Sequence, residues 1–340
     1  MYSVAVVGLG YFSQFHLASW VAMPGATVIG ATDLSEDRRA WASSTYKVPV
    51  FDTLNSILAK KPDIVDIVAP PSAHAGLVRA AMARGRTIVC QKPFCASLEE
   101  ATTVANEAKA AGARILIHEN FRFQPWYRTI KNKLTDGSFG HVYSATFLLR
   151  PGDGRGPDAY LDRQPSFQTM ERLMVAETGI HFIDTFRWLL GEVTSIYADL
   201  RQLNPVLKGE DAGIVVMEHA SGAQSTIDAN RLSDHPTDDL RRTMGEMTIE
   251  GEGGTLTVNG MGRVWFRPFG QQKGEVLPLA FPAGASFGGG CVAALNRHVI
   301  EALDGKRPFE NSVFDYLPNM ALSDLAYASD AAGQKIQVPA

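Results

Sequence analysis

The stretch SVAVVGLGYFS, residues 3–13, decides the fold, because it joins an apolar, β-branched run directly to a Gly-x-Gly turn. Val4 to Val7 is typical of a strand that is buried on both faces. Gly8 and Gly10 stand where a dinucleotide-binding fold needs glycine, since the tight turn lets phosphate oxygens approach the backbone N–H groups at the helix start. Ser13 occupies the third glycine position of GxGxxG, so we expect looser packing between strand and helix there.

Strand and helix patterns alternate along the chain as far as residue 121. Further buried strands are expected at 27–32, 64–69, 87–90 and 114–118. The helix before the last of these strands opens with Ser97-Leu98-Glu99-Glu100, which has the spacing of a capping box. This alternation predicts an α/β Rossmann domain, a doubly wound parallel sheet, over residues 1–121.

The pattern changes in residues 122–340, where a strand is expected at 142–149. Beyond residue 191 strands follow one another without intervening helices, at 194–200, 212–219, 223–231, 244–250 and 255–258. The pattern predicts a C-terminal α+β domain with a large, mainly antiparallel open sheet. Helices are too few to cover both faces of such a sheet, so we expect a homo-oligomer, either a dimer or a tetramer.

Composition limits the classes of function. Hydrophobic residues make up 45% and charged residues 20% of the 340, as in ordinary globular domains. The net charge of −4 offers no positive surface for nucleic acid or an anionic membrane. Three cysteines without CxxC spacing indicate neither disulfides nor a metal site. With no leader and no apolar run long enough to span a membrane, the prediction is a cytoplasmic protein.

Residues 175–191, VAETGIHFIDTFRWLLG, predict a buried helix that ends at Gly191. Glu177, His181 and Asp184 fall on one narrow face of it, because steps of four and three residues return to nearly the same side. A buried Glu and His need partners. They form either a structural pair inside the core or a catalytic acid/base pair. The loop 150–165 just before this helix is long and polar, so it is expected to be functional or mobile.

Two residues at strand ends point to a cofactor. Asp33 ends the second strand, where a carboxylate accepts hydrogen bonds from the adenosine ribose and repels a 2′-phosphate, so NAD is favoured over NADP. The alternative is a helix-capping Asp33, and Arg38 and Arg39 nearby leave NADP open. Lys92 follows the strand 87–90 at its carboxyl end, where doubly wound sheets bind ligands, and is therefore expected at the cofactor site rather than in bulk solvent.

Five motifs occur together and in order: Gly8-x-Gly10, Asp33, Gln91-Lys92-Pro93, Asn120-Phe121-Arg122-Phe123-x-Pro125 and Glu177-x3-His181-x2-Asp184. In this combination the chain resembles, over essentially its whole length, the Gfo/Idh/MocA oxidoreductases, the glucose–fructose oxidoreductase and inositol dehydrogenase family. The resemblance implies a Rossmann domain, a second domain whose open sheet serves oligomerisation, and NAD(P)-dependent oxidation of a sugar or polyol.

The resemblance also assigns residues. It makes Lys92, His181 and Glu177 catalytic. Gln91 stands for the family's Glu, so a neutral amide would hold the nicotinamide ribose, and Glu177 stands for its Asp, which leaves open whether His181 or another group is the base. The expected cofactor-binding residues are Gly8, Gly10, Tyr11, Phe12, Asp33, Arg38, Pro70, Ser72, His74, Gln91, Lys92 and Arg122. The expected substrate-binding residues are Lys92, Asn120, Arg122, Arg150, Glu177, His181 and Asn230, and Arg231 is a further candidate for the substrate or the cofactor.

Oxidation of an alcohol requires removal of the hydroxyl proton while a hydride leaves. Histidine, with an ordinary pKa near 6.5, suits the proton transfer. Lys92 would hydrogen-bond the reacting oxygen, and Glu177 would orient or charge-stabilise the imidazole. We therefore expect an NAD-dependent dehydrogenase acting on a neutral sugar or polyol, with a pentose such as apiose as the candidate that the resemblance suggests. The alternatives are an NAD-dependent glycoside hydrolase with transient oxidation and a non-catalytic NAD-binding sensor, which would need neither Lys92 nor His181.

Overall fold

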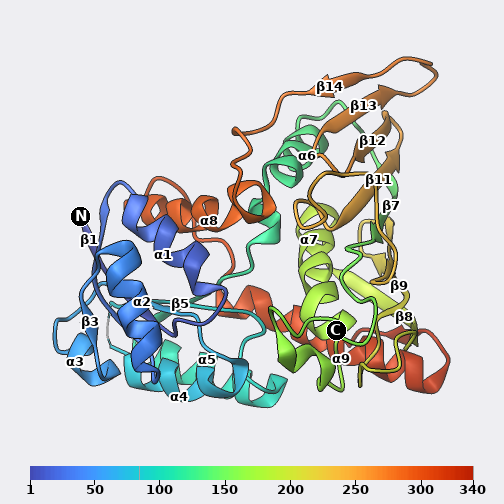
Figure 1. Ribbon diagram of the computed structural model, residues 1–340. Coiled ribbons are helices and arrows are strands. Elements are labelled where there is room, and N and C mark those ends of the chain that lie inside the picture. The colour runs from blue at the N-terminus through green and yellow to red at the C-terminus, as the bar shows by residue number, and fades with distance from the viewer. Residues whose placement is uncertain (84, 340) are drawn as a thin grey trace. The chain divides into compact units, whose positions relative to one another are not determined.

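The computed structural model describes residues 1–83 and 85–339, and the chain divides into two compact units (Figure 1). Unit 1 comprises Met1–Asn120 together with Val292–Met320, and unit 2 comprises Phe121–Cys291 and the chain from Ala321 onward. The single boundary expected after residue 121 does not describe the C-terminal stretch, because residues 292–320 pack with unit 1.

Unit 1 contains a six-stranded parallel sheet in the order β3-β2-β1-β4-β5-β6. Its strands are β1 (Tyr2–Val7), β2 (Ala26–Thr32), β3 (Val50–Phe51), β4 (Ile64–Ile67), β5 (Thr87–Cys90) and β6 (Arg114–Ile117). The strand order reverses between β1 and β4, and doubly wound sheets bind ligands outside the carboxyl ends of the strands at such a point. The predicted Rossmann sheet is confirmed.

Helices cover both faces of this sheet (Figure 1). They are α1 (Ser13–Ala22), α2 (Glu36–Tyr46), α3 (Leu54–Leu58), α4 (Pro71–Ala81), α5 (Leu98–Ala110) and, from Val292 on, α8 (Phe287–Leu303). On one face α8 meets α1, where the amide of Asn296 donates to the hydroxyl of Ser19 at 3.0 Å. On the other face α4 and α5 lie side by side. Of the predicted capping box, the Ser97 hydroxyl accepts the Glu100 N–H as expected, whereas the Glu100 carboxylate accepts the N–H of Ala96 instead of that of Ser97.

Unit 2 contains a nine-stranded sheet in the order β14-β13-β12-β11-β7-β10-β9-β8-β15. Its strands are β7 (Val142–Leu149), β8 (Val193–Arg201), β9 (Ala212–His219), β10 (Gln224–Asn230), β11 (Gly245–Gly251), β12 (Gly254–Val258), β13 (Val264–Pro268), β14 (Glu275–Leu277) and β15 (Ile336–Gln337). Among these described strands only β7 and β10 pair in parallel. The mainly antiparallel sheet is confirmed, and the strands that the sequence did not predict lie at its edges.

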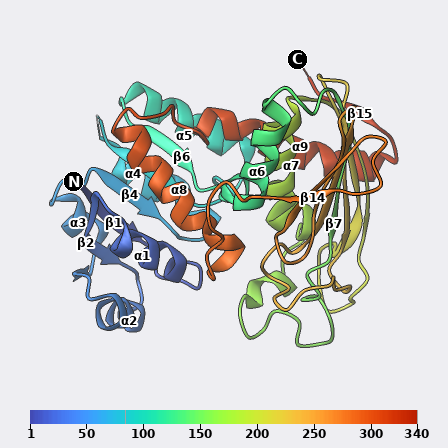
Figure 2. The same cartoon turned by 90° about the horizontal axis from the view of Figure 1, so that it is seen from above.

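One face of the nine-stranded sheet carries the core of unit 2. Figure 2 shows helix α7 (Ile180–Leu190) running along that face. The rings of Phe182 on α7 and Phe147 on β7 stack at 3.7 Å. Further helical segments of this unit are η1 (Phe121–Phe123), α6 (Pro125–Thr135), η2 (Pro165–Gln168) and the C-terminal part of α9 (Val313–Ala332). Strand alternation sends Leu148, Ile214 and Trp265 to the opposite face, where all three are exposed.

The helix predicted over 175–191 is not a single α-helix. Met174–Gly179 (η3) is a π-helix, and α7 begins only at Ile180, whose N–H bonds to the carbonyl of Val175 five residues back. Gly179 lies in this wider turn, where an added Cβ would come within 3.3 Å of the Met174 carbonyl oxygen. Such turns are rare and occur frequently at functional sites. The predicted end of the helix at Gly191 is correct.

Candidate active site

The turn between β1 and α1 needs its two glycines for different reasons. Gly8 has a φ of 92°, and a Cβ there would lie 2.5 Å from the Val68 carbonyl oxygen, so only glycine fits. At Gly10 no described atom lies within 4 Å of the position a Cβ would take, which leaves the backbone open to a ligand. Ser13, at the third glycine position, is buried, and its hydroxyl closes the turn by donating to the Gly10 carbonyl at 2.7 Å.

Asp33 braces the same turn. Its Oδ2 accepts the N–H of Leu9 at 2.7 Å, and its Oδ1 accepts the N–H of Ser35 at 2.8 Å. Helix α2 is capped by Ser35, so the capping role considered for Asp33 is wrong. Each carboxylate oxygen can accept a second hydrogen bond, and Asp33 is only half-buried. The carboxylate is therefore able to bind ribose hydroxyls while it holds the turn.

The other residues expected around the cofactor lie near this edge of the sheet. Tyr11 and Phe12 are half-buried in the turn, and Pro70 and Ser72 are exposed at the start of α4. The guanidinium of Arg38 lies over the ring of Trp41 at 5.3 Å.

His74 is buried, with its ring nitrogens 2.8 and 3.1 Å from the carbonyl oxygens of Ala69 and Pro93. Burial lowers its pKa, although the two carbonyls act in the opposite direction. His74 therefore ties together the segments that follow β4 and β5.

These features fit a dinucleotide. The open backbone at Gly10 and the start of α1 suit a pyrophosphate, and the Asp33 carboxylate suits a ribose. Lys92 lies half-buried just after β5 at the same carboxyl edge of the sheet. The neighbouring Gln91 is buried, and its Oε1 accepts the N–H of Lys92 at 3.2 Å.

In unit 2, the segment η1 holds α7 at two points. The ring of His181 stacks on Phe121, with centroids 3.9 Å apart and planes 2° from parallel. One turn later Asp184 forms a bidentate ion pair with Arg122, at 2.7 and 2.5 Å. Asn120, just before η1, is buried. Arg122, expected to bind cofactor or substrate, is therefore occupied in fixing the helix that carries His181.

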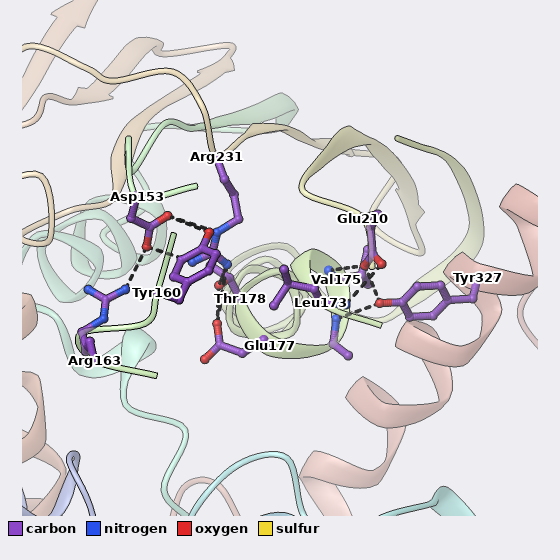
Figure 3. Close-up of polar contacts among 11 residues, drawn as sticks. Asp153, Tyr160, Arg163, Leu173, Val175, Glu177, Thr178, Glu210, Arg231 and Tyr327 are labelled. Carbon is purple, nitrogen blue, oxygen red and sulfur yellow. Dashed lines mark hydrogen bonds and ion pairs between the residues drawn. The ribbon is translucent and has the colours of Figure 1, made fainter. Parts of the chain in front are cut away.

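Glu177 is held by a buried arginine (Figure 3). Its Oε2 accepts the hydroxyl of Thr178 at 2.6 Å, and Nη1 of Arg231 lies 3.7 Å from the same oxygen. The same Nη1 donates to the Thr178 hydroxyl at 2.8 Å. Arg231 is 1% exposed, whereas the Glu177 side chain keeps 20% of its surface exposed. A carboxylate that remains accessible is thus fixed from its buried side by a full positive charge.

The other side of Arg231 is paired with the loop 150–165. Its Nε and Nη2 donate to the two carboxylate oxygens of Asp153 at 3.2 and 3.0 Å, and Arg163 donates to Asp153 at 3.0 Å (Figure 3). Burial alone would raise the pKa of Asp153, but the charges of the two arginines outweigh it and the pKa is lowered. The pKa of Arg231 is raised, because its acidic neighbours outweigh its own burial. The loop is therefore anchored to the helix by ion pairs.

A second carboxylate caps the start of this helical segment. Glu210 accepts the N–H groups of Leu173 and Val175, at 3.2 and 3.0 Å, and the hydroxyl of Tyr327 at 2.5 Å (Figure 3). Burial, and then the charge of Glu210, raise the pKa of Tyr327. Negative charge at a helix N-terminus is stabilising, so Glu210 fixes the end from which Glu177 projects.

Two of the expected substrate residues, Arg150 and Asn230, lie away from Glu177 and His181. Arg150 donates to the Asp228 carboxylate at 2.8 Å, and Asp228 and Asn230 point to the face of the sheet opposite α7, since Ala229 between them is in the core. The next residue, Arg231, points to the helix side. Arg231, a candidate for binding the substrate or the cofactor, is instead paired with Asp153 and Thr178. Its partner Asp153 lies 78 positions away in sequence, and no local pattern links them.

Cys90, Cys95 and Cys291 are free and buried, as expected. Burial raises the pKa of Cys95 to about 12. The residues that the structure describes hold no group of His, Cys, Asp and Glu that could bind a metal ion. None of the helices in the described part of the chain is long and apolar enough to cross a membrane.

Comparison with known proteins agrees with this geometry. The "Oxidoreductase family, NAD-binding Rossmann fold" (GFO_IDH_MocA) matches residues 2–119, and the "GFO/IDH/MocA C-terminal domain" matches residues 127–257. The D-apiose dehydrogenase of Paraburkholderia graminis is 27% identical over 98% of this chain and 89% of its own length. That of Rhizobium rhizogenes is 27% identical over 99% of this chain and 97% of its own.

A solved structure is also similar. An oxidoreductase from Agrobacterium radiobacter, crystallised with NAD+, L-tartaric acid and magnesium, superposes with a TM-score of 0.89 at 26% identity, covering 99% of this chain and 98% of that one. These comparisons confirm the predicted fold, the NAD cofactor and the predicted class, an NAD-dependent sugar or polyol dehydrogenase. The chain belongs to the Gfo/Idh/MocA oxidoreductase family, with an NAD-binding Rossmann domain at its N-terminus.

Proposed function

We propose that this protein oxidises a hydroxyl group of a neutral pentose, with D-apiose as the first candidate, and that His181, Glu177 and Lys92 are its catalytic residues. The observation that carries the proposal is the arrangement of His181 and Glu177. The imidazole is fixed by stacking on Phe121, and the carboxylate one turn earlier is fixed by the buried cation of Arg231. The choice of D-apiose is supported by the two relatives that bear that name.

Each residue has a defined task in the reaction. NAD, when bound, accepts the hydride. His181 removes the hydroxyl proton, and Phe121 limits the ring to one orientation. Glu177 stabilises the imidazolium that forms, because its negative charge favours the protonated ring. Lys92 donates a hydrogen bond to the oxygen on which negative charge develops. Asp33 would hold the adenosine ribose, and the open backbone at Gly10 would hold the pyrophosphate.

Incubation of the protein with NAD and a panel of sugars tests the proposal. We expect absorbance of NADH to grow with D-apiose or another pentose and not with sugar phosphates or sugar acids, since the proposed substrate is neutral. Hydrolysis of a glycoside without net NADH would identify the alternative hydrolase. Binding of NAD without any turnover would identify the sensor. Either of those two results would overturn the dehydrogenase proposal.

Asp33→Ala tests the binding of the cofactor separately from the binding of the sugar. Losing a charged acceptor costs about 1.5–3 kcal/mol, roughly 10- to 100-fold in NAD affinity. The sugar residues are untouched, so at saturating NAD the order of preference among the sugars should not change. Equal use of NADP and NAD by the wild-type protein would remove the role assigned to Asp33.

We further propose a homo-oligomer assembled through the open face of the nine-stranded sheet. Strand register places one row of outward-facing side chains across seven strands: Tyr197, Val216, Thr226, Thr146, Thr248, Thr257 and Trp265. The row carries hydroxyl, aliphatic and aromatic groups and no charge, which suits burial against a second copy.

Thr146→Arg places a charge in the middle of this row, and we expect it to lower the particle mass measured by light scattering at micromolar concentration. A buried, unpaired charge at an interface disfavours association. Thr102→Arg on the exposed side of α5 is the matched control and should leave the mass of wild type. A wild-type protein with the mass of one chain would contradict the proposed assembly.

We also propose that the protein works in the cytoplasm. The three cysteines are free, buried and distributed without pairing, which suits a reducing compartment. A fusion to a fluorescent protein or fractionation of the native cells tests this location.

A further inference from the structure

A connected set of buried polar side chains runs through unit 1, apart from the residues assigned to the substrate. Its members are Asp66, His16, Gln91, His118, Asn296 and Ser19, none of them more than 8% exposed. Gln91 is in the middle, between the two histidines. Its Nε2 lies 2.8 Å from His16 Nε2 and 3.3 Å from His118 Nδ1.

The protonation of His16 follows from its two partners. Asp66 Oδ2 lies 2.7 Å from His16 Nδ1 and accepts the indole N–H of Trp20 at 2.7 Å. A carboxylate only accepts hydrogen bonds, so Nδ1 of His16 carries the proton. On the other side an amide NH2 only donates, so Nε2 of His16 must be the acceptor and carries no proton. His16 is therefore neutral, with its proton on Nδ1.

The same reasoning gives the opposite tautomer at His118. The second N–H of the Gln91 amide points to His118 Nδ1, which must accept it. The proton of His118 then lies on Nε2, which faces the amide oxygen of Asn296 at 3.3 Å. Asn296 in turn donates to Ser19. Each of these contacts thus pairs one donor with one acceptor, and neither ring is charged.

We infer that Gln91 is a positioning residue, whose amide holds His16 and His118 as opposite neutral tautomers and at the same time fixes the main chain at Lys92. The second task uses the amide oxygen, which accepts the Lys92 N–H at 3.2 Å. Only the consequence for catalysis rests on the proposed role of Lys92. A carboxylate at position 91 would have no N–H to donate, so His16 Nε2 and His118 Nδ1 would both lose their donor. These two contacts could form again only if the histidine rings or the carboxylate took up further protons.

The surroundings make such a charge change costly. The two imidazole rings are 4.1 Å apart, so two cations there would repel each other. Asp66 already has one carboxylate oxygen, Oδ1, without a hydrogen-bond partner among the described residues. A second buried carboxylate nearby would add negative charge to a site that has already left one oxygen unsatisfied. The neutral amide avoids both problems.

Nitrogen-15 NMR of the histidine rings in the full-length protein tests this inference. In wild type at pH 7 we expect one buried ring protonated at Nδ1 and the other at Nε2, assigned from the loss of signals in His16→Asn and His118→Asn. Gln91→Glu should convert at least one of these rings to the doubly protonated form. Turnover should fall about tenfold with the KM for the sugar nearly unchanged, because Lys92 is displaced while the sugar contacts remain.

Gln271→Glu, at an exposed position of unit 2, makes the same chemical change and should alter neither the spectrum nor the turnover. The inference is overturned if either wild-type ring is doubly protonated, if both rings carry the proton on the same nitrogen, or if Gln91→Glu leaves both signals as they were. The wild-type spectrum decides the tautomers even if Gln91→Glu does not fold. Since the spectrum needs no substrate, a protein without sugar oxidation but with these tautomers would refute the proposed function and leave the network standing.

Discussion

His181→Ala is expected to fold normally and bind NAD, while its turnover falls roughly 10²- to 10⁴-fold. The reason is that the variant loses the group that accepts the hydroxyl proton but keeps the stacked platform of Phe121 and the Arg231–Glu177 pair. Melting temperature, NAD affinity and turnover are to be measured on the same preparation. Lys92→Met should behave alike, and the double variant should lose less than the product of the two effects if both groups serve one proton transfer.

His141→Ala is the control, because His141 is an exposed histidine of the same unit. It should retain the turnover and melting temperature of wild type. The opposite pattern would support the structural interpretation of the helix. If His181→Ala melted far below wild type and yet kept near-normal turnover at low temperature, the histidine would be a core residue and the catalytic assignment would be abandoned.

Arg231→Gln is expected to lower the free energy of unfolding by about 3–5 kcal/mol, which is typical when one partner of a buried ion pair is removed. The variant leaves Asp153 with Arg163 and the Tyr160 hydroxyl, and it takes the positive charge from behind Glu177. Turnover should fall as well, since the carboxylate loses its fixed position. Denaturant unfolding and steady-state kinetics measure the two effects separately.

The effect has a predictable dependence on pH. Because the pKa of Asp153 in the folded protein is below its ordinary value of 3.8, the Asp153–Arg231 pair contributes stability above that value and loses it as the pH falls through the folded pKa. The difference in free energy of unfolding between wild type and Arg231→Gln should therefore have its full size at pH 7 and become smaller below about pH 4.

Arg163→Gln is the matched control, since Arg163 pairs with the same carboxylate through one nitrogen. It should cost less stability and leave turnover nearly unchanged. Equal losses of turnover in the two variants would mean that Arg231 acts by anchoring the loop and not by holding Glu177.

The features that could be predicted from the sequence are those formed by residues that lie close together along the chain. The Rossmann sheet followed from short local signals, namely the run Val4–Val7, the Gly8-x-Gly10 turn and regular alternation. Glu177 and His181 were found in the same way, from their spacing within one helix. The π-turn at Met174–Gly179 was not predicted, because the widened turn leaves no periodic signature in six residues.

The partners of the site residues could not be predicted for a related reason. Arg231 reaches Asp153 across 78 positions and Thr178 across 53, and only the folded sheet brings them together. Gln91 illustrates a different limit. The motif placed it near the cofactor, but its amide is occupied by two histidines that lie far away in sequence. A motif gives the position of a residue, whereas the use of its atoms depends on tertiary neighbours.

The division of unit 1 into two segments has a consequence for biosynthesis. A ribosome completes Met1–Asn120 first and must then make residues 121–291 before Val292–Met320 emerges. At about 5–20 residues per second this interval lasts roughly 10–35 s. Throughout it, the face of α1 that Asn296 will cover is bare, and Ser19 lacks its amide partner. The nascent Rossmann sheet is therefore expected to be a client of chaperones until Val292–Met320 has been translated.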